Sequence, residues 1–141
     1  MRASIGEIYR VPLRKEDSIT PKYGYDSRSK FCVVIATPDF GYYVAYLVID
    51  HEINEKFNPT KELKDSFFPL NKKDYPDFIK KQYDPSWLDM TKIREMDMSR
   101  LDSEGVLIGK LTDRDLAIVI QCLKDSELIT IKEKRRCGLM P

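Results

Sequence analysis

Two apolar stretches decide the fold: Lys30–Ala36 (KFCVVIA) and Tyr42–Asp50 (YYVAYLVID). Both are rich in β-branched or aromatic residues, which favour strands, and both have the length of a strand. The intervening Thr37–Gly41 carries a proline and a glycine, which is the composition of a turn. These features predict a β-hairpin as the central element of the chain.

The flanking sequence adds further short strands. Ile5–Leu13 alternates in the period of a strand, and Pro12 places its end at an edge or exit. Ser66–Leu70, Trp87–Met90, Ile93–Met98 and Leu128–Ile131 have the composition of further short strands. Asp74–Gln82 is predicted to form a short helix interrupted by Pro76.

The clearest helix signal comes late in the chain. Over Asp113–Lys124, apolar residues recur at helical spacing, at Leu116, Val119, Ile120 and Leu123. Thr112 precedes the segment and, with Asp115, forms a variant of the capping box. We therefore predict a mainly β (α+β) fold, in which a C-terminal amphipathic helix packs on a small, strongly bent β-barrel or sheet.

Length and charge limit the class of protein. The chain has 141 residues, with 24 Lys and Arg against 23 Asp and Glu. This size fits one domain, predicted over residues 1–131 with a basic, exposed tail at 132–141. The balanced charge excludes a polycation that coats nucleic acid, although a local basic patch remains compatible with it. No apolar run approaches the length of about 18 residues needed to span a membrane, and the first residues lack the apolar core of a signal peptide. The expected location is the cytoplasm.

The residue counts also argue against metal and cofactor chemistry. The three cysteines, Cys32, Cys122 and Cys137, form no Cys-x-x-Cys pair and are interpreted as buried thiols. The single histidine, His51, cannot build a multi-histidine metal site. The six glycines are scattered and form no phosphate-binding loop. We expect neither a metal nor a cofactor.

Several segments, taken in order, resemble the PemK/MazF toxin family. Ile93–Leu101 (IREMDMSRL), Gly109–Leu116 (GKLTDRDL) and the helix ending near Ser126 resemble its C-terminal signature. Gly6–Val11 (GEIYRV) and Lys30–Ile35 (KFCVVI) resemble its first and second strands. The resemblance runs from residue 5 to about 126 and is interrupted by an apparent insertion at 51–85.

The resemblance implies an SH3-like barrel with a C-terminal helix, usually a homodimer. It also implies a sequence-selective endoribonuclease that needs no metal and is held inactive by an antitoxin partner. In such cleavage the ribose 2′-OH attacks the adjacent phosphate, which requires a general base, a general acid and a cation.

The sequence departs from the family pattern at the catalytic positions. Lys30 stands where the family has an arginine, so the charge is kept but the planar fork is lost. Ile49-Asp50 stands where some members have Thr-Ser, and Asp89-Met90-Thr91 stands where others have an Arg-x-Asp pair. No catalytic set of the family is carried over intact.

The candidate catalytic residues are Lys30, Asp50, His51 and Arg94. Lys30 and Arg94 would hold phosphate, and Asp50 or His51 would move protons, since histidine titrates near neutral pH. The alternatives are a surface histidine that begins a loop and a structural ion pair of Arg94 with Asp97 or neighbours of Glu95.

The candidate RNA-binding residues are Lys22, Tyr23, Tyr25 and Arg28. Cations interleaved with tyrosines supply charge for phosphates and rings for stacked bases. The alternative is a solvated loop. The aromatic residues of the insertion, among them Tyr75 and Phe78, form either a small core over a barrel edge or a lid or partner surface.

Two functions follow. The first is a toxin-like component of a toxin–antitoxin system that binds RNA and cleaves it without metal. The second is the same barrel without nuclease activity, binding nucleic acid or a protein partner. The missing hydroxyl and arginine favour the second function, and the kept order of the family segments is compatible with both.

Overall fold

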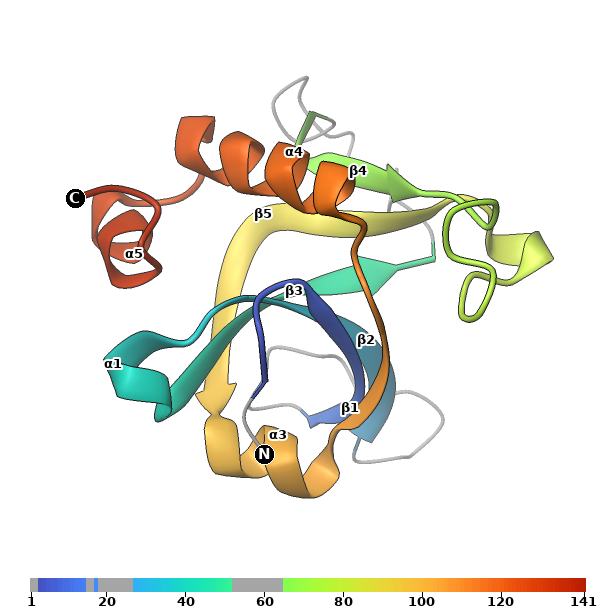
Figure 1. Cartoon of the computed structure of the whole chain (residues 1–141), viewed down its shortest axis with the longest axis horizontal. Coiled ribbons are helices and arrows are strands. Elements are labelled where there is room, and N and C mark those ends of the chain that lie inside the picture. The colour runs from blue at the N-terminus through green and yellow to red at the C-terminus, as the bar shows by residue number, and fades with distance from the viewer. Residues whose placement is uncertain (1–2, 15–16, 18–26, 52–64) are drawn as a thin grey trace.

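The computed structural model describes residues 3–14, 17, 27–51 and 65–141. Six antiparallel strands form one curled, half-barrel sheet in the order β4-β5-β3-β2-β1-β6 (Figure 1). The strands are β1 (Glu7–Arg14), β2 (Ser27–Ala36), β3 (Tyr43–Asp50), β4 (Phe67–Leu70), β5 (Ser86–Asp97) and β6 (Val106–Lys110). The helices are α1 (Pro38–Gly41), η3 (Lys81–Tyr83), α3 (Met98–Glu104), α4 (Asp113–Asp125) and α5 (Ile131–Arg136). The predicted mainly β fold with a bent sheet and a C-terminal amphipathic helix is confirmed.

The predicted central hairpin is present as β2 and β3. Their ladder pairs Phe31 with Ile49 and Val33 with Leu47. The turn between the strands is the short α1, where Asp39 and Phe40 have positive φ angles of 54° and 57°. This left-handed conformation costs energy for residues other than glycine, and it displays the Phe40 side chain, which is 94% exposed.

Strand β5 is one long strand, so the prediction of two separate pieces is wrong. It pairs with β3 on both sides of a register shift, with Arg94 opposite Tyr46 and Asp89 opposite Val48. Such irregularities bend a strand, and Figure 1 shows β5 turning sharply along the sheet. The strand stops at Asp97, and the next residues form the unpredicted helix α3, which closes one end of the curl.

The two faces of the sheet carry two separate apolar cores. The first core includes Val33, Leu47 and Leu88 and is covered by Val119 and Leu123 of α4. The second core is built from alternate strand residues and from α3: Val11, Cys32, Val34, Tyr46, Val48, Met96, Met98 and Leu101. Because strand residues alternate between faces, this division fixes which side chains lie beside one another.

The part of the insertion that the structure describes joins the main core. The predicted helix at 74–82 is wrong: the segment forms turns, followed by η3. Pro76 has no backbone N–H and cannot continue a helical ladder. Tyr75 and Phe78 pack into the first core instead of forming a separate one, and the Tyr75 hydroxyl donates a hydrogen bond to Asp115 Oδ2 of α4 at 2.5 Å.

The C-terminal segment forms a helix where a strand and an exposed tail were expected. Thr130 and Glu133 form a reciprocal capping box, which starts α5 at Ile131, and the predicted strand at 128–131 is wrong. Beyond α5, Cys137 and Leu139 are buried in the first core, so the expectation of an exposed tail is wrong for these residues. Gly138, with a φ of 71°, allows the chain to turn back onto the core.

None of the helices in the described part of the chain has the length and apolar character needed to cross a bilayer.

Candidate nucleic-acid interface

The start of β2 and the end of β3 bring two sequence-predicted site residues together. The ladder between these strands ends with Phe31 opposite Ile49, so Lys30 and Asp50 are the next residues in register. Their side chains form an ion pair, with Lys30 Nζ 2.8 Å from Asp50 Oδ1. The side chains keep 15% and 29% of their surface exposed, so water and ligands can reach the pair.

Arg28 lies on the same face of the sheet as Lys30. In β2 the two residues are two positions apart, and they oppose Leu13 and Val11, which both belong to the second core. The structure thus places Arg28 and Lys30 next to each other on the face of β2 that carries the second core. The other predicted RNA-binding residues, Lys22, Tyr23 and Tyr25, lie outside the described residues.

Arg94 faces the second core from β5, and its contacts are structural. Its Nη1 donates a hydrogen bond to the main-chain oxygen of Asp17 at 2.5 Å. Among the described residues, Arg94 forms no ion pair with Asp97 or with a neighbour of Glu95, and Glu95 itself pairs with Arg136. Arg94 therefore anchors the backbone of Asp17.

Cys32 is buried on the same face of the sheet as Lys30 and Arg94. Burial raises the pKa of its thiol to about 12, while the positive charges of Arg94 and Lys30 act in the opposite direction. Desolvation disfavours the thiolate more than these cations favour it. Cys32 is thus a neutral, inert thiol between the two candidate cations, in line with the prediction of a buried thiol.

Asp17 and Arg100 form a network that the sequence did not indicate. The Arg100 guanidinium donates to both carboxylate oxygens of Asp17 at 2.7 Å, and its Nε donates to Glu104 Oε2 at 2.9 Å. The hydrogen bonds from Arg100 lower the pKa of Asp17 despite its desolvation. Arg100 belongs to Ile93–Leu101, the stretch for which a resemblance to the toxin family was predicted, so the sequence could have indicated it as a residue of interest. Asp17 belongs to a polar stretch of sequence that contains no such motif.

Aromatic rings surround the end of β3. The His51 ring stacks on Tyr83 of η3, with centroids 4.1 Å apart and planes inclined by 15°. Trp87 of β5 lies directly opposite Asp50 in the ladder and is half-buried. These neighbours follow from strand register and from the path of the insertion, which the sequence alone does not give.

The site offers charge and rings but no cluster for a metal ion. Among the described residues, no group of three or more His, Cys, Asp and Glu side chains is placed to hold a metal. Two cavities lined by described residues lie elsewhere, beside α1 and α3 and beside the end of α4.

The sequence matches no family model and no curated protein. The site is therefore interpreted from its own chemistry. That chemistry consists of Lys30 paired with Asp50, Arg28 along the same edge, and the stacked rings of His51 and Tyr83.

Proposed function

We propose that the chain binds single-stranded RNA at the end of the sheet formed by Arg28, Lys30, Asp50 and His51. The observation that supports this most is the partly exposed ion pair between Lys30 and Asp50, with a second cation beside it. Lys30 is a compact charge on a flexible stem, so it can turn from the carboxylate to an incoming phosphate. Arg28 can hold the next phosphate along the strand.

The rings give the bases a place to stack. A base can extend the stack of His51 and Tyr83 or lie on Trp87 on the opposite side of Asp50. Stacking on aromatic side chains accepts every base and contributes about 1–3 kcal/mol per base. Charge and stacking together are the usual requirements for binding single strands.

The same arrangement supports metal-independent cleavage, as expected of a toxin-like component of a toxin–antitoxin system. Asp50 or His51 would take the proton of the ribose 2′-OH while its oxygen bonds to phosphorus. The bond from phosphorus to the 5′-oxygen would break, and that oxygen would receive a proton from the other group or from water. Lys30 would stabilise the charge on the phosphoryl oxygens. The products are a 2′,3′-cyclic phosphate and a 5′-hydroxyl.

A second candidate function is binding without cleavage. Asp50 already neutralises Lys30, and β3 ends in Ile49-Asp50, which provides no hydroxyl. Arg94, the third proposed phosphate ligand, is held by Asp17. These contacts favour a barrel that binds nucleic acid or a protein partner. An antitoxin-like partner and a homodimer belong to the first function and are proposed with it.

The experiment is incubation of the purified protein with a long mixed-sequence RNA in the presence of chelator. The first function predicts discrete fragments that end in 2′,3′-cyclic phosphate, and Lys30→Ala abolishes them. Lys110→Ala, which removes an exposed lysine on the far edge strand β6, serves as the matched control and leaves cleavage unchanged.

The remaining outcomes separate the two functions. RNA that is bound but intact, with no growth arrest on expression, supports the second function and rejects the nuclease. RNA that is neither bound nor cut rejects RNA binding altogether. Sedimentation velocity of the purified protein tests the homodimer in the same samples.

A further inference from the structure

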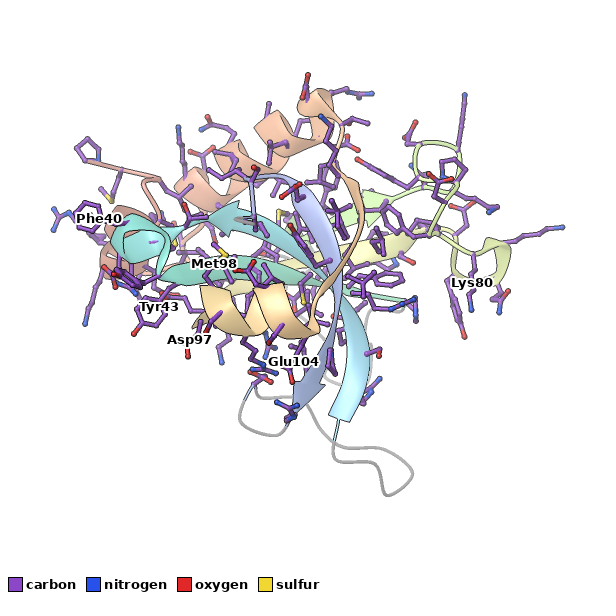
Figure 2. The ribbon with its side chains drawn as sticks, turned by 60° about the horizontal axis from the view of Figure 1, so that its bottom comes forward. Phe40, Tyr43, Lys80, Asp97, Met98 and Glu104 are labelled. Atoms are coloured by element: carbon purple, nitrogen blue, oxygen red, sulfur yellow. The ribbon has the colours of Figure 1, made fainter. Side chains whose placement is uncertain are left out.

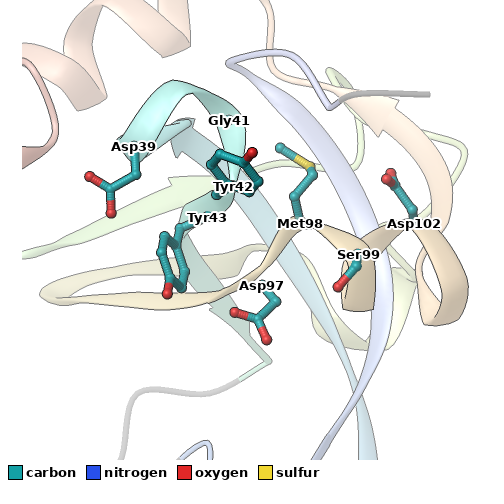
Figure 3. Close-up of a pocket in the computed structure, with 8 residues that line it drawn as sticks. All are labelled: Asp39, Gly41, Tyr42, Tyr43, Asp97, Met98, Ser99 and Asp102. Atoms are coloured by element: carbon teal, nitrogen blue, oxygen red, sulfur yellow. The ribbon is translucent and has the colours of Figure 1, made fainter.

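A groove lies at the end of the sheet opposite to Lys30. It has a volume of about 560 Å³ and is open to solvent. Its walls come from the α1 turn, the start of β3, the end of β5 and α3 (Figure 3). The residues that line it are Asp39, Gly41, Tyr42, Tyr43, Asp97, Met98, Ser99 and Asp102.

The groove and the proposed RNA site are separated by the length of β3. Tyr43 begins this strand and Asp50 ends it, which corresponds to about 23 Å at a rise of about 3.3 Å per residue. Figure 2 shows Tyr43 and Asp97 at one end of the molecule and Lys80, just before η3, at the other. The groove is thus a separate surface.

The charge of the groove is negative. Three carboxylates line it, those of Asp39, Asp97 and Asp102, and the described lining residues include no lysine or arginine. Within the described part of the chain, Asp97 and Asp102 make no hydrogen bond or ion pair through their side chains. Both are exposed and keep their charge available for a ligand.

The groove also presents two aromatic rings. Tyr42 is 73% exposed and Tyr43 is 37% exposed, which is unusual for such large side chains. Figure 3 shows the Tyr43 ring between the carboxylates of Asp39 and Asp97, and the Tyr42 ring toward Met98. Flat rings next to carboxylates suit a guanidinium group, which stacks through its plane and donates hydrogen bonds through its edge.

The chain itself shows how this surface receives a guanidinium. Arg136 reaches the rim from α5 and donates to Asp39 Oδ2 at 3.1 Å and to Glu95 Oε2 at 2.7 Å. Its Cζ lies 5.4 Å from the centre of the Tyr43 ring, within the range of a cation–π contact. Tyr42, Asp97 and Asp102 line the rest of the groove.

We propose that this groove binds an arginine-containing peptide segment of a partner protein. Asp97 and Asp102 bind the guanidinium groups, and the Tyr42 ring stacks on one of them. RNA is disfavoured, because Asp97 and Asp102 would repel its phosphates, and Arg136 at the rim is already paired with Asp39 and Glu95. A divalent cation is disfavoured because, among the residues the structure describes, these carboxylates do not converge into a metal-binding cluster. The proposal is independent of the proposed RNA function.

The test is fluorescence anisotropy with the full-length protein and a short, labelled peptide that contains several arginines. We expect saturable binding that weakens as salt is added. A peptide with citrulline in place of each arginine keeps the shape and loses the charge, and it should not bind. The lysine peptide should bind more weakly, because an ammonium lacks the planar fork.

Two variants locate the binding site. The double substitution of Asp97→Asn with Asp102→Asn is isosteric and should weaken the arginine peptide about tenfold, since it removes both exposed negative charges that face the guanidinium groups. Tyr42→Leu should weaken it about threefold. The charge-matched control, Asp74→Asn with Asp77→Asn, removes two exposed carboxylates of the insertion and should change nothing.

The outcomes decide the proposal. It is overturned if the arginine peptide does not bind, if it binds the groove double variant as tightly as the control, or if the citrulline peptide binds equally well. It is also overturned if sedimentation shows that the groove variant only converts a dimer into monomers, since the occupant is then a second copy of the chain. Circular dichroism establishes that each variant is folded before it is measured.

Discussion

The ammonium group of Lys30, near the start of β2, lies 2.8 Å from the carboxylate of Asp50, the last residue of β3. A phosphate that approaches this end of the sheet has to compete with Asp50 for the same cation. Because the pair is partly exposed, its contribution to stability is small, about 0–1 kcal/mol. The pair therefore matters more for ligand binding than for folding.

Asp50→Asn should move RNA binding and RNA cleavage in opposite directions. The substitution removes the competing negative charge, so RNA binds about two- to tenfold more tightly through Lys30. If Asp50 moves a proton, cleavage falls at the same time. The free energy of unfolding should change by no more than about 1 kcal/mol, as measured by urea denaturation. Weaker RNA binding by the variant would contradict this account, and Asp74→Asn is the control.

Asp17→Asn should destabilise the protein in a pH-dependent way. Arg100 lowers the pKa of Asp17 in the folded state below its ordinary value of 3.8. A lowered carboxyl pKa stabilises the fold above the unfolded pKa, and this contribution is lost as the pH falls through the folded pKa. The variant should lose about 1–3 kcal/mol at pH 7, and the difference from wild type should shrink below about pH 4.

The measurement for Asp17 is urea denaturation of both proteins across this pH range. A difference that stays constant from pH 7 to pH 3 would show that the ion pair with Arg100 does not carry the effect. Asp77→Asn, at an exposed carboxylate in the insertion, controls for the change in net charge.

Tyr75→Phe should loosen the insertion from α4. The Tyr75 hydroxyl donates to Asp115 at 2.5 Å and accepts from the Thr112 backbone N–H at 3.2 Å, at the start of that helix. Phenylalanine keeps the buried ring and leaves both partners unsatisfied, at a cost of about 1–3 kcal/mol in unfolding free energy. Tyr42→Phe, at a hydroxyl exposed to solvent, should cost less than about 0.5 kcal/mol. Equal losses in the two variants would remove the role assigned to Tyr75.

The hairpin of β2 and β3 and the helix α4 could be predicted from the sequence, because neighbouring residues determine them. The hairpin of β2 and β3 has apolar, β-branched strands around a proline-containing turn, and α4 has helical spacing and the cap at Thr112. The adjacency of Lys30 and Asp50 follows from the same hairpin register. These parts of the fold and site could be read without knowledge of distant contacts.

The continuous strand β5, the helix α3 and the contacts of His51 and Arg94 could not be predicted, because they depend on contacts between segments that are distant in the sequence. Residues 86–97 form one strand because they bend around β3, and α3 forms because Met98 and Leu101 cover the second core. The stacking of His51 on Tyr83 and the hydrogen bond from Arg94 to Asp17 join residues far apart in the chain. The capping box of α5 was visible at Thr130 and Glu133, and a strand was predicted there because Leu128–Ile131 is apolar.

The binding of single-stranded RNA to wild type, Lys30→Ala and Lys110→Ala, measured over a range of salt concentrations, tests the central claim most directly. The account predicts that Lys30→Ala weakens binding about tenfold and makes the slope of log K against log salt shallower by about 0.7, the value for one lost phosphate contact on a single strand. Lys110→Ala should keep both the wild-type affinity and the wild-type slope. Equal affinities and slopes for wild type and Lys30→Ala would contradict the claim that this end of the sheet holds the phosphate.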